Sequence, residues 1–412
     1  MGAAEPSRIL REYRQRVWTK DDGLPSNTVS TIHQTQDGYL WIGMDSAVAR
    51  FDGSKFTVFN QDNSPISPHW STTVMAEQND GGLWIGLGYG LLLYKNGSFT
   101  RFTNQDGLWD DDVRALHVGR SGKVWIGSME GASVYENGTL RRLPRPGSIA
   151  PDSRVRGLYE DDSGLLWICP ESGVHKYHIA TGEYEEVRHD GGRFYPKSMH
   201  KDATGGIWIG DQHQFFRLEK DRWIRYALPE DRPLVWVTSL LTDQAGSVWF
   251  VMSESRVGRF RDGKFTFFDY RDGLAAVGIL RIFDDRDGNL WFATIEGGLV
   301  CWQPRRFNLY TTQDGLPDDD VRTIFESRDG SVWIGTEGGL CQFKEGRFTS
   351  YQREPGPQNT IRTIAQDSTG ALWLGTLGAG VACLRDGKFT DYPLPGDRYG
   401  GIVRSLAIGK DD

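Results

Sequence analysis

The sequence has no long apolar run, few cysteines and no excess of basic residues, and each absence argues against a class of protein. No apolar segment approaches the length of a membrane span, and no signal-peptide core follows the initial methionine. The net charge is −8, with Arg and Lys scattered among acids, which argues against a nucleic-acid binder. The eight histidines show no metal-ligand spacing, and neither HExxH nor GxSxG occurs. We therefore expect no membrane segment in this chain, no nucleic-acid partner, no metal, no cofactor and no catalytic residue.

What the sequence does contain is a repeat marked by tryptophan. Nine times a glycine stands three residues before a tryptophan, an aliphatic residue comes directly before that tryptophan, and successive tryptophans are 40 to 43 residues apart. A period of about 40–45 residues is the length of one four-stranded propeller blade. The nine tryptophans are Trp41, Trp84, Trp125, Trp167, Trp208, Trp249, Trp291, Trp333 and Trp373. The repeat predicts an all-β chain of nine four-stranded antiparallel blades.

The eighth repeat shows the expected strands most clearly. Val321–Ser327 alternates as a strand does, and Ser331–Thr336, Leu340–Phe343 and Arg347–Tyr351 follow it, separated by glycine-containing turns. In each repeat we expect the glycine ahead of the tryptophan to supply a positive φ, and the tryptophan to pack between adjacent blades. Aspartate–glycine stretches such as Asp284–Gly288 are interpreted as turns and not as calcium loops, because they lack the alternating acidic pattern of such loops.

The four cysteines fall in different repeats. Cys301, Cys341 and Cys383 occupy one equivalent strand of three successive blades, and Cys169 stands two residues after Trp167. Equivalent positions in adjacent blades are more than about 7 Å apart at Cα, which is too far for a disulfide. We therefore expect all four to be buried as small hydrophobic side chains.

The chain begins and ends inside a repeat. Tyr13–Thr19 has the form of a fourth strand, and Gly401–Ile408 copies a first strand, so that either end could extend a neighbouring blade and lock the ring. We favour one domain over residues 1–412, a single ring of nine blades, although four to eight blades are typical. The alternative is part of a longer multi-propeller array, in which a complete ring is followed by the start of another.

The stretch from Arg16 to Phe59 resembles the first repeat of a two-component regulator propeller. The family pattern runs DGLxxxxV, DGxLWIGT, GGLxRFD and FTxY, and repeats one, three, seven, eight and nine follow it. The resemblance covers essentially the whole chain. It implies the input domain of a bacterial hybrid signalling protein, located outside the cytoplasmic membrane (periplasmic) and binding a small molecule or oligosaccharide. An immunoglobulin-like domain, a transmembrane helix and a kinase usually follow such a propeller, and we expect none of these output elements in this chain.

Repeats four, five and six depart from the pattern, and in a repeat protein such departures are where function is expected. The connections into these repeats lack DGL, and the segments after Trp167, Trp208 and Trp249 depart from WIGT. We expect these segments to meet at one end of the central channel and to bind a polar ligand, because guanidinium and aromatic groups beside carboxylates suit a sugar or an organic anion. The candidate ligand-binding residues are Arg154, Arg193, Tyr195, His213, Trp236, Glu254 and Arg256. Trp70 and Trp109 are weaker candidates for the same rim.

Three functions compete on the sequence alone. A ligand-sensing input domain is favoured by the resemblance and by the divergent repeats. A propeller enzyme of lyase, lactonase or glycosidase type is the second, since fold alone excludes no chemistry, although no pair of carboxylates stands out. A protein-interaction scaffold is the third, and it would present a broad exposed apolar patch.

Overall fold

The computed structural model describes residues 12–147, 149, 153–220, 222–229, 235–253, 256–269, 272, 274, 278–305, 309–351, 356, 359–394 and 401–409. These residues form 36 strands arranged as nine four-stranded antiparallel sheets. Three short 3-10 helices occur in the described part of the chain, η1 (Lys20–Asp22), η2 (Asn104–Asp106) and η4 (Thr312–Asp314). The all-β class and the nine four-stranded blades are confirmed. None of the described helices has the length and apolar character needed to cross a bilayer.

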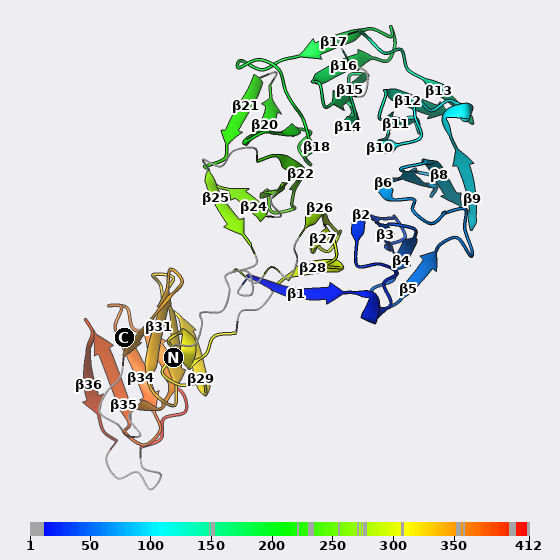
Figure 1. Ribbon diagram of the computed structural model, residues 1–412. Helices are drawn as coiled ribbons and strands as arrows, with labels where there is room; N and C mark the ends of the chain where they lie inside the picture. The colour runs from blue at the N-terminus through cyan, green and yellow to red at the C-terminus, as the bar shows by residue number, and fades with distance from the viewer. Residues whose placement is uncertain are drawn as a thin grey trace. The chain divides into compact units, whose positions relative to one another are not determined.

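The chain divides into two compact units, Met1–Arg305 (unit 1) and Arg306–Asp412 (unit 2). Unit 1 holds seven blades around a centre, and the first strand of each blade lies innermost (Figure 1). From the inner to the outer strand, the blades of unit 1 are β2 (Val29–Gln34), β3 (Leu40–Met44), β4 (Val48–Phe51), β5 (Phe56–Phe59); β6 (Thr72–Glu77), β7 (Leu83–Leu87), β8 (Gly90–Lys95), β9 (Ser98–Phe102); β10 (Val113–Val118), β11 (Val124–Ser128), β12 (Ala132–Glu136), β13 (Thr139–Arg142); β14 (Val155–Glu160), β15 (Leu165–Pro170), β16 (Val174–His178), β17 (Tyr184–Val187); β18 (Ser198–Lys201), β19 (Ile207–Asp211), β20 (Gln214–Glu219), β21 (Arg222–Ala227); β22 (Val237–Thr242), β23 (Val248–Met252), β24 (Arg256–Arg261), β25 (Lys264–Phe268); and β26 (Ile279–Asp284), β27 (Leu290–Thr294), β28 (Leu299–Pro304), β1 (Tyr13–Trp18).

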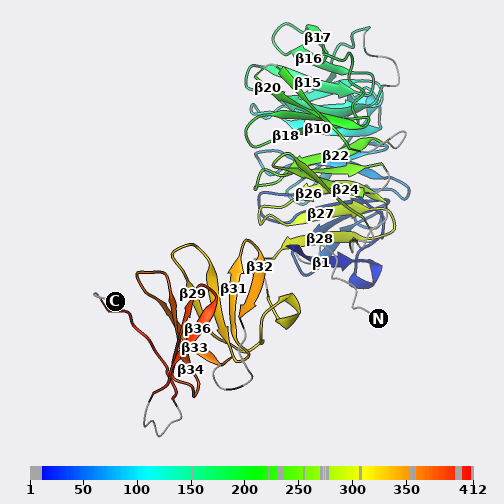
Figure 2. The ribbon, with the colours of Figure 1, turned by 90° about the vertical axis from the view of Figure 1, so that its left-hand side faces the viewer.

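The N-terminal strand closes the ring of unit 1. β1 pairs antiparallel with β28, from Tyr13 opposite Pro304 to Trp18 opposite Leu299, and both views place the two strands side by side (Figures 1 and 2). The inner strand of the first blade, β2, contacts that of the seventh, β26. The seventh blade thus takes its outer strand from the start of the chain, as the sequence of Tyr13–Thr19 suggested.

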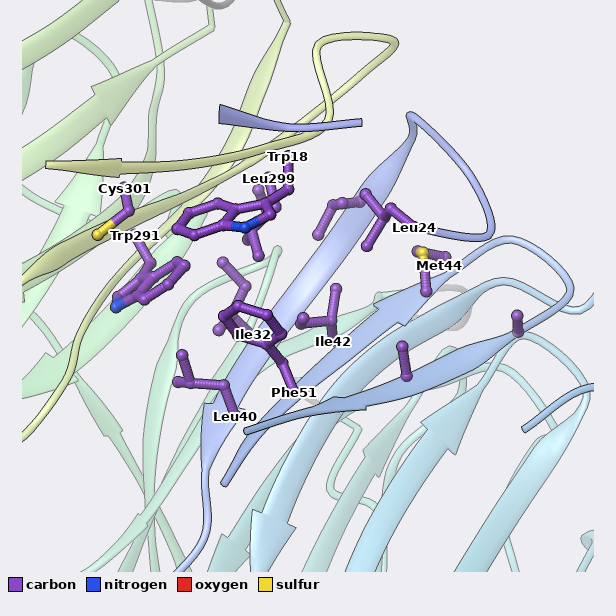
Figure 3. Close-up of a cluster of buried hydrophobic side chains, with 14 residues drawn as sticks. Trp18, Leu24, Ile32, Leu40, Ile42, Met44, Phe51, Trp291, Leu299 and Cys301 are labelled. Atoms are coloured by element: carbon purple, nitrogen blue, oxygen red, sulfur yellow. The ribbon is translucent and has the colours of Figure 1, made fainter. Parts of the chain in front are cut away.

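An aromatic cluster fills the junction between the first and seventh blades (Figure 3). The Trp18 ring stacks on that of Trp291 with centroids 5.3 Å apart, and the edge of Phe51 meets Trp18 at the same distance. Leu24 and Cys301 complete the packing from opposite sides of the junction. Since an aromatic side chain buries a large apolar area, this cluster is a main source of ring stability.

The structure groups the nine blades differently from the single nine-bladed ring that we favoured. Seven blades form unit 1, because β1 occupies the outer edge of the β26–β28 sheet, and the other two blades belong to unit 2. The correction follows from one long-range pairing that a repeat period does not encode. The arrangement matches the alternative, a complete ring followed by further blades.

Unit 2 contains two blades and a C-terminal segment, residues 401–403, that contacts the second of them. The blades are β29 (Val321–Glu326), β30 (Val332–Thr336), β31 (Leu340–Lys344), β32 (Arg347–Tyr351); and β33 (Ile361–Gln366), β34 (Leu372–Thr376), β35 (Val381–Arg385), β36 (Lys388–Tyr392). The Val403 amide donates to the Thr376 carbonyl (2.9 Å), and Ile402 forms a bridge with Leu377. Residues 401–403 therefore lie beside the end of β34, but they make a single bridge there and the expected strand Gly401–Ile408 is not formed.

Glycines at two positions of the repeat have different roles, the first present in all nine repeats and the second in six. The glycine ahead of each tryptophan has a positive φ, 82° at Gly164 for example, and all nine confirm the expected hairpin conformation. The glycine two residues after the tryptophan gives space instead. A Cβ at Gly127 would lie 2.6 Å from Val155 Cγ1 in the next blade, so a larger side chain here would force these two blades to shift.

Five of the nine repeat tryptophans donate a hydrogen bond to an aspartate in the turn that precedes them. Trp208 Nε1 donates to Asp202 Oδ2 (2.8 Å), while Asp202 Oδ1 accepts from the amides of Thr204 and Gly206. Burial opposes ionisation, but these hydrogen bonds prevail and lower the pKa of Asp202 to about 2. Asp285 accepts from two turn amides and from an indole in the same way, which confirms the interpretation of Asp284–Gly288 as a turn.

The cysteines and tryptophans occupy the expected places. All four cysteines are buried and free, and burial raises the pKa of Cys301 to about 12. The tryptophans of the first eight repeats belong to apolar clusters that join successive blades, for example Trp167 with Ile207 of the next blade. The expectation for the cysteines is confirmed, and that for the tryptophans is confirmed in the first eight repeats.

Candidate functional site: the channel of unit 1

A β-bulge in the inner strand aims one side chain of each blade at the ring centre. In the fourth blade, Val155 pairs with Pro170 and Gly157 pairs with Cys169, so Arg156 is the extra residue between them. A bulge of this kind re-aims a side chain, and bulges are frequent beside functional sites. Six inner strands of unit 1 show the same shift. In the fifth blade Lys197 holds the equivalent place, and its amide donates to the Gly210 carbonyl.

The side chains at these positions surround a cavity of about 530 Å³. Every inner strand of unit 1 contributes to the wall, and the volume lies within the range of about 300–1,000 Å³ that is usual for small-molecule sites. The seven residues at the bulge position, all of which line the cavity, are Ser30, Thr73, Arg114, Arg156, Lys197, Thr238 and Leu280. The sheet register thus converts one position of the repeat into a ring of side chains around the channel.

The wall of this cavity is strongly basic on one side. Arg114, Arg156 and Lys197 come from three successive blades, and Arg281 is added by β26. No carboxylate is among the described residues that line the cavity. The channel therefore carries an excess of positive charge in a chain whose net charge is −8.

Glu171 gathers two of these cations. Its Oε1 accepts from Arg156 Nε (2.7 Å) and from Lys197 Nζ (3.1 Å), and the two side chains of the first pair are each 28% exposed. Burial raises the pKa of this carboxyl, but the hydrogen bonds from Arg156 and Lys197 outweigh that effect and leave the pKa below its usual value. Glu171 is thus ionised and is the counter-ion of two cations, Arg156 of the fourth blade and Lys197 of the fifth. Arg114 has a separate partner, since its Nε lies 2.7 Å from Asp112 Oδ1.

Arg281 differs from the other cations of the channel. Its Nη2 reaches past the first blade and donates to the Thr73 carbonyl of the second blade, at 3.2 Å. The guanidinium is accessible to water within the channel but has protein around it, and this desolvation lowers the pKa of Arg281 to about 10. Arg156 and Arg114 contribute further by repulsion, so the three guanidinium groups are close enough to feel one another.

Two residues predicted from the divergent repeats adjoin the Glu171 network. The Arg154 carbonyl accepts a hydrogen bond from the Glu171 amide (2.9 Å), and Lys197 Nζ lies 5.0 Å from the centroid of the Trp236 ring. The side chain of Arg154 also contacts Met129, with Nε and Sδ 2.7 Å apart. Arg154 and Trp236 therefore lie beside the channel cations without lining the cavity.

The remaining predicted residues are placed elsewhere around these blades. Arg193 Nε lies 2.7 Å from Glu186 Oε1 on the outer strand β17. Tyr195 is 55% exposed, and its amide donates to Asp211 Oδ2. His213 has a positive φ of 56° in the turn between β19 and β20. The structure does not bring these three side chains into the cavity wall.

Arg256 and the two weaker candidates, Trp70 and Trp109, each take part in a cation–π contact. Arg256 Cζ lies 5.1 Å from the centroid of the Phe267 ring, and Trp70 and Trp109 each lie beneath an arginine at 4.4 and 5.5 Å. Glu254 lies outside the described residues. Arg256, like the other described members of the predicted set, does not line the channel.

Sequence reasoning missed the basic residues of the channel because it looked for divergence between repeats. The sequence pattern shows the residue after the first-strand valine as one position of a regular strand, whereas in the structure it occupies the bulge. Val113-Arg114 and Val155-Arg156 carried the signal, since an arginine directly after that valine is aimed at the ring centre. Arg281 had no comparable signal, because it follows the bulge by one residue.

No metal centre accompanies this site in the described part of the chain. No group of three or more His, Cys, Asp or Glu side chains there is arranged to hold an ion. A second cavity, of about 590 Å³, lies at the outer side of unit 1 between His189–Gly191 and Arg222–Arg225. It lacks the convergence of several blades that distinguishes the channel.

Four segments of the sequence match the model of the two component regulator propeller family. They are residues 23–46, 273–296, 315–338 and 355–378. The matches fall at the starts of repeats one, seven, eight and nine. These repeats are two component regulator propeller repeats. The resemblance noted from DGL and WIGT is thereby confirmed for these four repeats. The matches leave out the second to sixth repeats, including the third, which we expected to follow the pattern.

Solved structures support the same fold. The extracellular domain of a putative hybrid two component system from B. thetaiotaomicron superimposes with a TM-score of 0.66 at 19% identity, over 97% of this chain and 57% of that one. The extracellular domain of a putative one component system from the same organism gives 0.58 at 18% identity, over 93% of this chain and 54% of that one. The chain thus spans a little over half the length of these two domains.

A lyase of the same architecture is also similar. A streptogramin B lyase structure superimposes with a TM-score of 0.60 at 14% identity, over 73% of this chain and 100% of the lyase chain. A search of curated proteins found no matching sequence. At these identities the structural matches establish the fold alone.

The shared motif of the two component regulator propeller repeats is scaffold in this structure. In the first DGL element, Asp22 Oδ2 accepts from the Thr19 amide (2.9 Å) and caps η1, Gly23 has a φ of 92°, and Leu24 is buried. The motif therefore turns the chain from one blade into the next. The side chains that line the cavity, by contrast, include those at the bulge positions, which the motif leaves variable.

Proposed function

We propose that this chain is a ligand-sensing input domain that binds a small polar molecule in the channel of unit 1. The observation that carries the proposal is the cavity of about 530 Å³ at the ring centre, into which the bulges of the inner strands aim basic and hydroxyl side chains. Convergent polar groups in a well-formed cavity are the usual mark of a small-molecule site. A small carbohydrate or organic acid is of a suitable size and polarity for this space.

The family and the similar structures support a signalling role. Two of those structures are extracellular domains of a putative hybrid two component system and a putative one component system. We infer by analogy that this propeller lies outside the cytoplasmic membrane (periplasmic) and passes ligand binding to a signalling output domain. The inference of location and partner rests on this kinship, whereas the inference of a ligand rests on the channel itself.

Binding without turnover suits the chemistry of the channel. Glu171 is held ionised by two cations, which makes it a poor proton donor at neutral pH. Arginine and lysine groups that are already paired with carboxylates orient and neutralise a ligand and do not transfer protons to it. We therefore propose a sensor and not an enzyme.

A ligand screen with a channel-filling variant tests the proposal. The full chain is screened by thermal shift against sugars, amino acids and organic acids, and each compound that stabilises it is recovered and checked for conversion. Leu280, which lines the cavity and is 36% exposed, is replaced by Trp to fill the channel and by Ala as the matched control. We expect stabilisation of the wild type and of L280A, no stabilisation of L280W, and unchanged compound.

Each part of the proposal has a result that contradicts it. If a compound stabilises L280W as much as the wild type, its binding site does not lie in the channel. If the compound is converted, the protein is an enzyme and the sensor proposal is contradicted. A protein partner that shifts the melting temperature when no small molecule does so favours a scaffold.

A further inference from the structure

No carboxylate of the described residues pairs with Arg281 in the channel. The hydrogen bond that the structure gives its guanidinium goes to the neutral Thr73 carbonyl. Arg114 and Arg156, which carry the same charge as Arg281, line the same cavity. A guanidinium has five N–H donors in a planar fork, so most of the hydrogen-bonding capacity of Arg281 remains for a ligand.

The charges around Arg281 do not balance. Arg114, Arg156, Lys197 and Arg281 bring four positive charges to the cavity wall. Their described carboxylate partners are two, Asp112 with Arg114 and Glu171 with Arg156 and Lys197. Cations enclosed by protein repel one another more strongly than in bulk water, because the surroundings screen them less. An anion placed between them would relieve that repulsion.

The cations also converge in space from separate parts of the ring. Arg281 extends from β26 across the first blade to the second, whereas Arg114 and Arg156 project from the third and fourth blades. All three side chains line one cavity, so the three guanidinium groups share the space of the channel. A planar fork pairs with a carboxylate, phosphate or sulfate through two parallel hydrogen bonds, which gives both strength and orientation.

We propose that the channel binds its ligand through an oxyanion group, a carboxylate, phosphate or sulfate, with Arg281 as the anchor and Arg156 and Arg114 as supporting cations. This inference rests on the proposed function and adds the chemical class of the ligand. The body of the ligand lies against the remaining wall, where Met75, Met199 and Leu280 offer apolar contact beside hydroxyl groups.

Glu171 has a distinct role in this arrangement. In the free protein it neutralises Arg156 and Lys197, so an incoming anion competes with it for the same N–H groups. Removal of its charge while the shape is kept is therefore expected to favour the anion. This effect is a gain of affinity, and a misfolded variant does not produce one.

The test compares matched charged and neutral probes on the full chain. Titration calorimetry pairs galacturonate with galactose and glucose 6-phosphate with glucose, and thermal shift is recorded with acetate, phosphate and sulfate alone, so that the three oxyanion sources are separated. The variants are Arg281→Met, Glu171→Gln, and Arg141→Met as control. Arg141 is exposed on the outer strand β13, so its replacement makes the same change of charge away from the channel.

We expect at least one charged probe to bind about tenfold or more tightly than its neutral match. R281M should abolish this preference, R141M should keep it, and E171Q should strengthen anion binding about threefold or more. The affinity for the charged probe should also fall as salt is raised from low to physiological ionic strength, because salt screens the electrostatic attraction.

The contrary outcomes separate the two proposals. If neutral sugars bind as tightly as their charged matches, or if R281M keeps the preference, the oxyanion inference is overturned while the sensor function stands. If E171Q weakens the binding of the anion, Glu171 is a ligand contact and not a competitor, and the oxyanion inference is again overturned. If the oxyanions fail to stabilise the wild type more than R281M, and no compound of the wider screen binds, both proposals fail.

Discussion

Replacing Trp18 with Ala is expected to open the ring of unit 1 at one particular junction. Trp18 is 8% exposed and lies between the first and seventh blades, where it stacks on Trp291 and meets the edge of Phe51. It is also the last residue of β1, the strand that completes the seventh blade. Its loss therefore weakens the closing strand and the packing between the two blades together.

The magnitude follows from the buried area. A buried aromatic side chain removes roughly 150–250 Å² from water, which at about 25 cal/mol per Å² corresponds to about 4–6 kcal/mol. A compact unfolded state reduces such a value by roughly 10–40%, and measured Trp→Ala changes in cores fall at about 3–5 kcal/mol. We expect about 4 kcal/mol, which is close to a thousandfold increase in the opening of the junction, at about 1.4 kcal/mol for each factor of ten.

Native-state hydrogen exchange of the full chain measures this opening directly. The amides of β28 should lose protection in W18A, while those of β15, on the other side of the ring, should keep it. A whole-protein melting curve would be less informative, because two units need not unfold in one step. W18F should show a smaller loss, since part of the aromatic contact is retained.

Tyr89→Ala provides the control, because Tyr89 is an aromatic residue of the same ring that is 56% exposed. Its replacement should leave exchange in β28 unchanged. If W18A exchanges like the wild type in β1 and β28, the junction is not held by this side chain, and the account of ring closure is refuted.

Two further perturbations test the packing between blades. Gly127→Ala should destabilise unit 1 by about 1–3 kcal/mol in a denaturant titration, because a Cβ would lie 2.6 Å from a valine of the next blade, and an unchanged midpoint would contradict the steric role of this glycine. Lowering the pH should also weaken the fold: burial lowers the pKa of His33, His117 and His200 to about 4, below the value of about 6.5 of an unfolded chain. Unfolding near pH 5 therefore takes up about one proton per histidine, so stability falls as the pH drops from about 6.5 towards 4. Burial raises the pKa of Asp284 to about 6, which offsets about one of these protons, and a stability that does not change with pH across this window would contradict the assignment.

Much of the fold followed from local pattern. The strands of the eighth repeat, the positive φ ahead of each tryptophan and the burial of the cysteines depend on residues a few positions apart, and the sequence displays all of them. Val321–Ser327, for example, differs from β29 by a single residue at its end. These features could be predicted because each repeat forms the same hairpins with the same turn residues.

The candidate site was harder to predict. Arg154 and Trp236 were chosen because their repeats diverge, and they adjoin the channel network, whereas Arg193 pairs with an outer strand. The residues that line the channel sit in the inner strands, where the register decides which side chain faces the centre. A bulge changes that register by one residue, and its effect is visible only once the strands are paired.

The sequence by itself determined the blade, and the tertiary structure decided the ring. A repeat of 40 to 43 residues specifies contacts within a blade and with its neighbours, so nine blades could be counted from the tryptophans alone. How many blades close into one ring depends on the pairing of β1 with β28, a contact between distant parts of the chain that no repeat unit contains. The same closure brings Arg281 of the seventh blade to Thr73 of the second and places it in one cavity wall with the arginines of the third and fourth. Local chemistry therefore made the scaffold predictable, while the meeting of like charges in the channel arose only when the ring was closed.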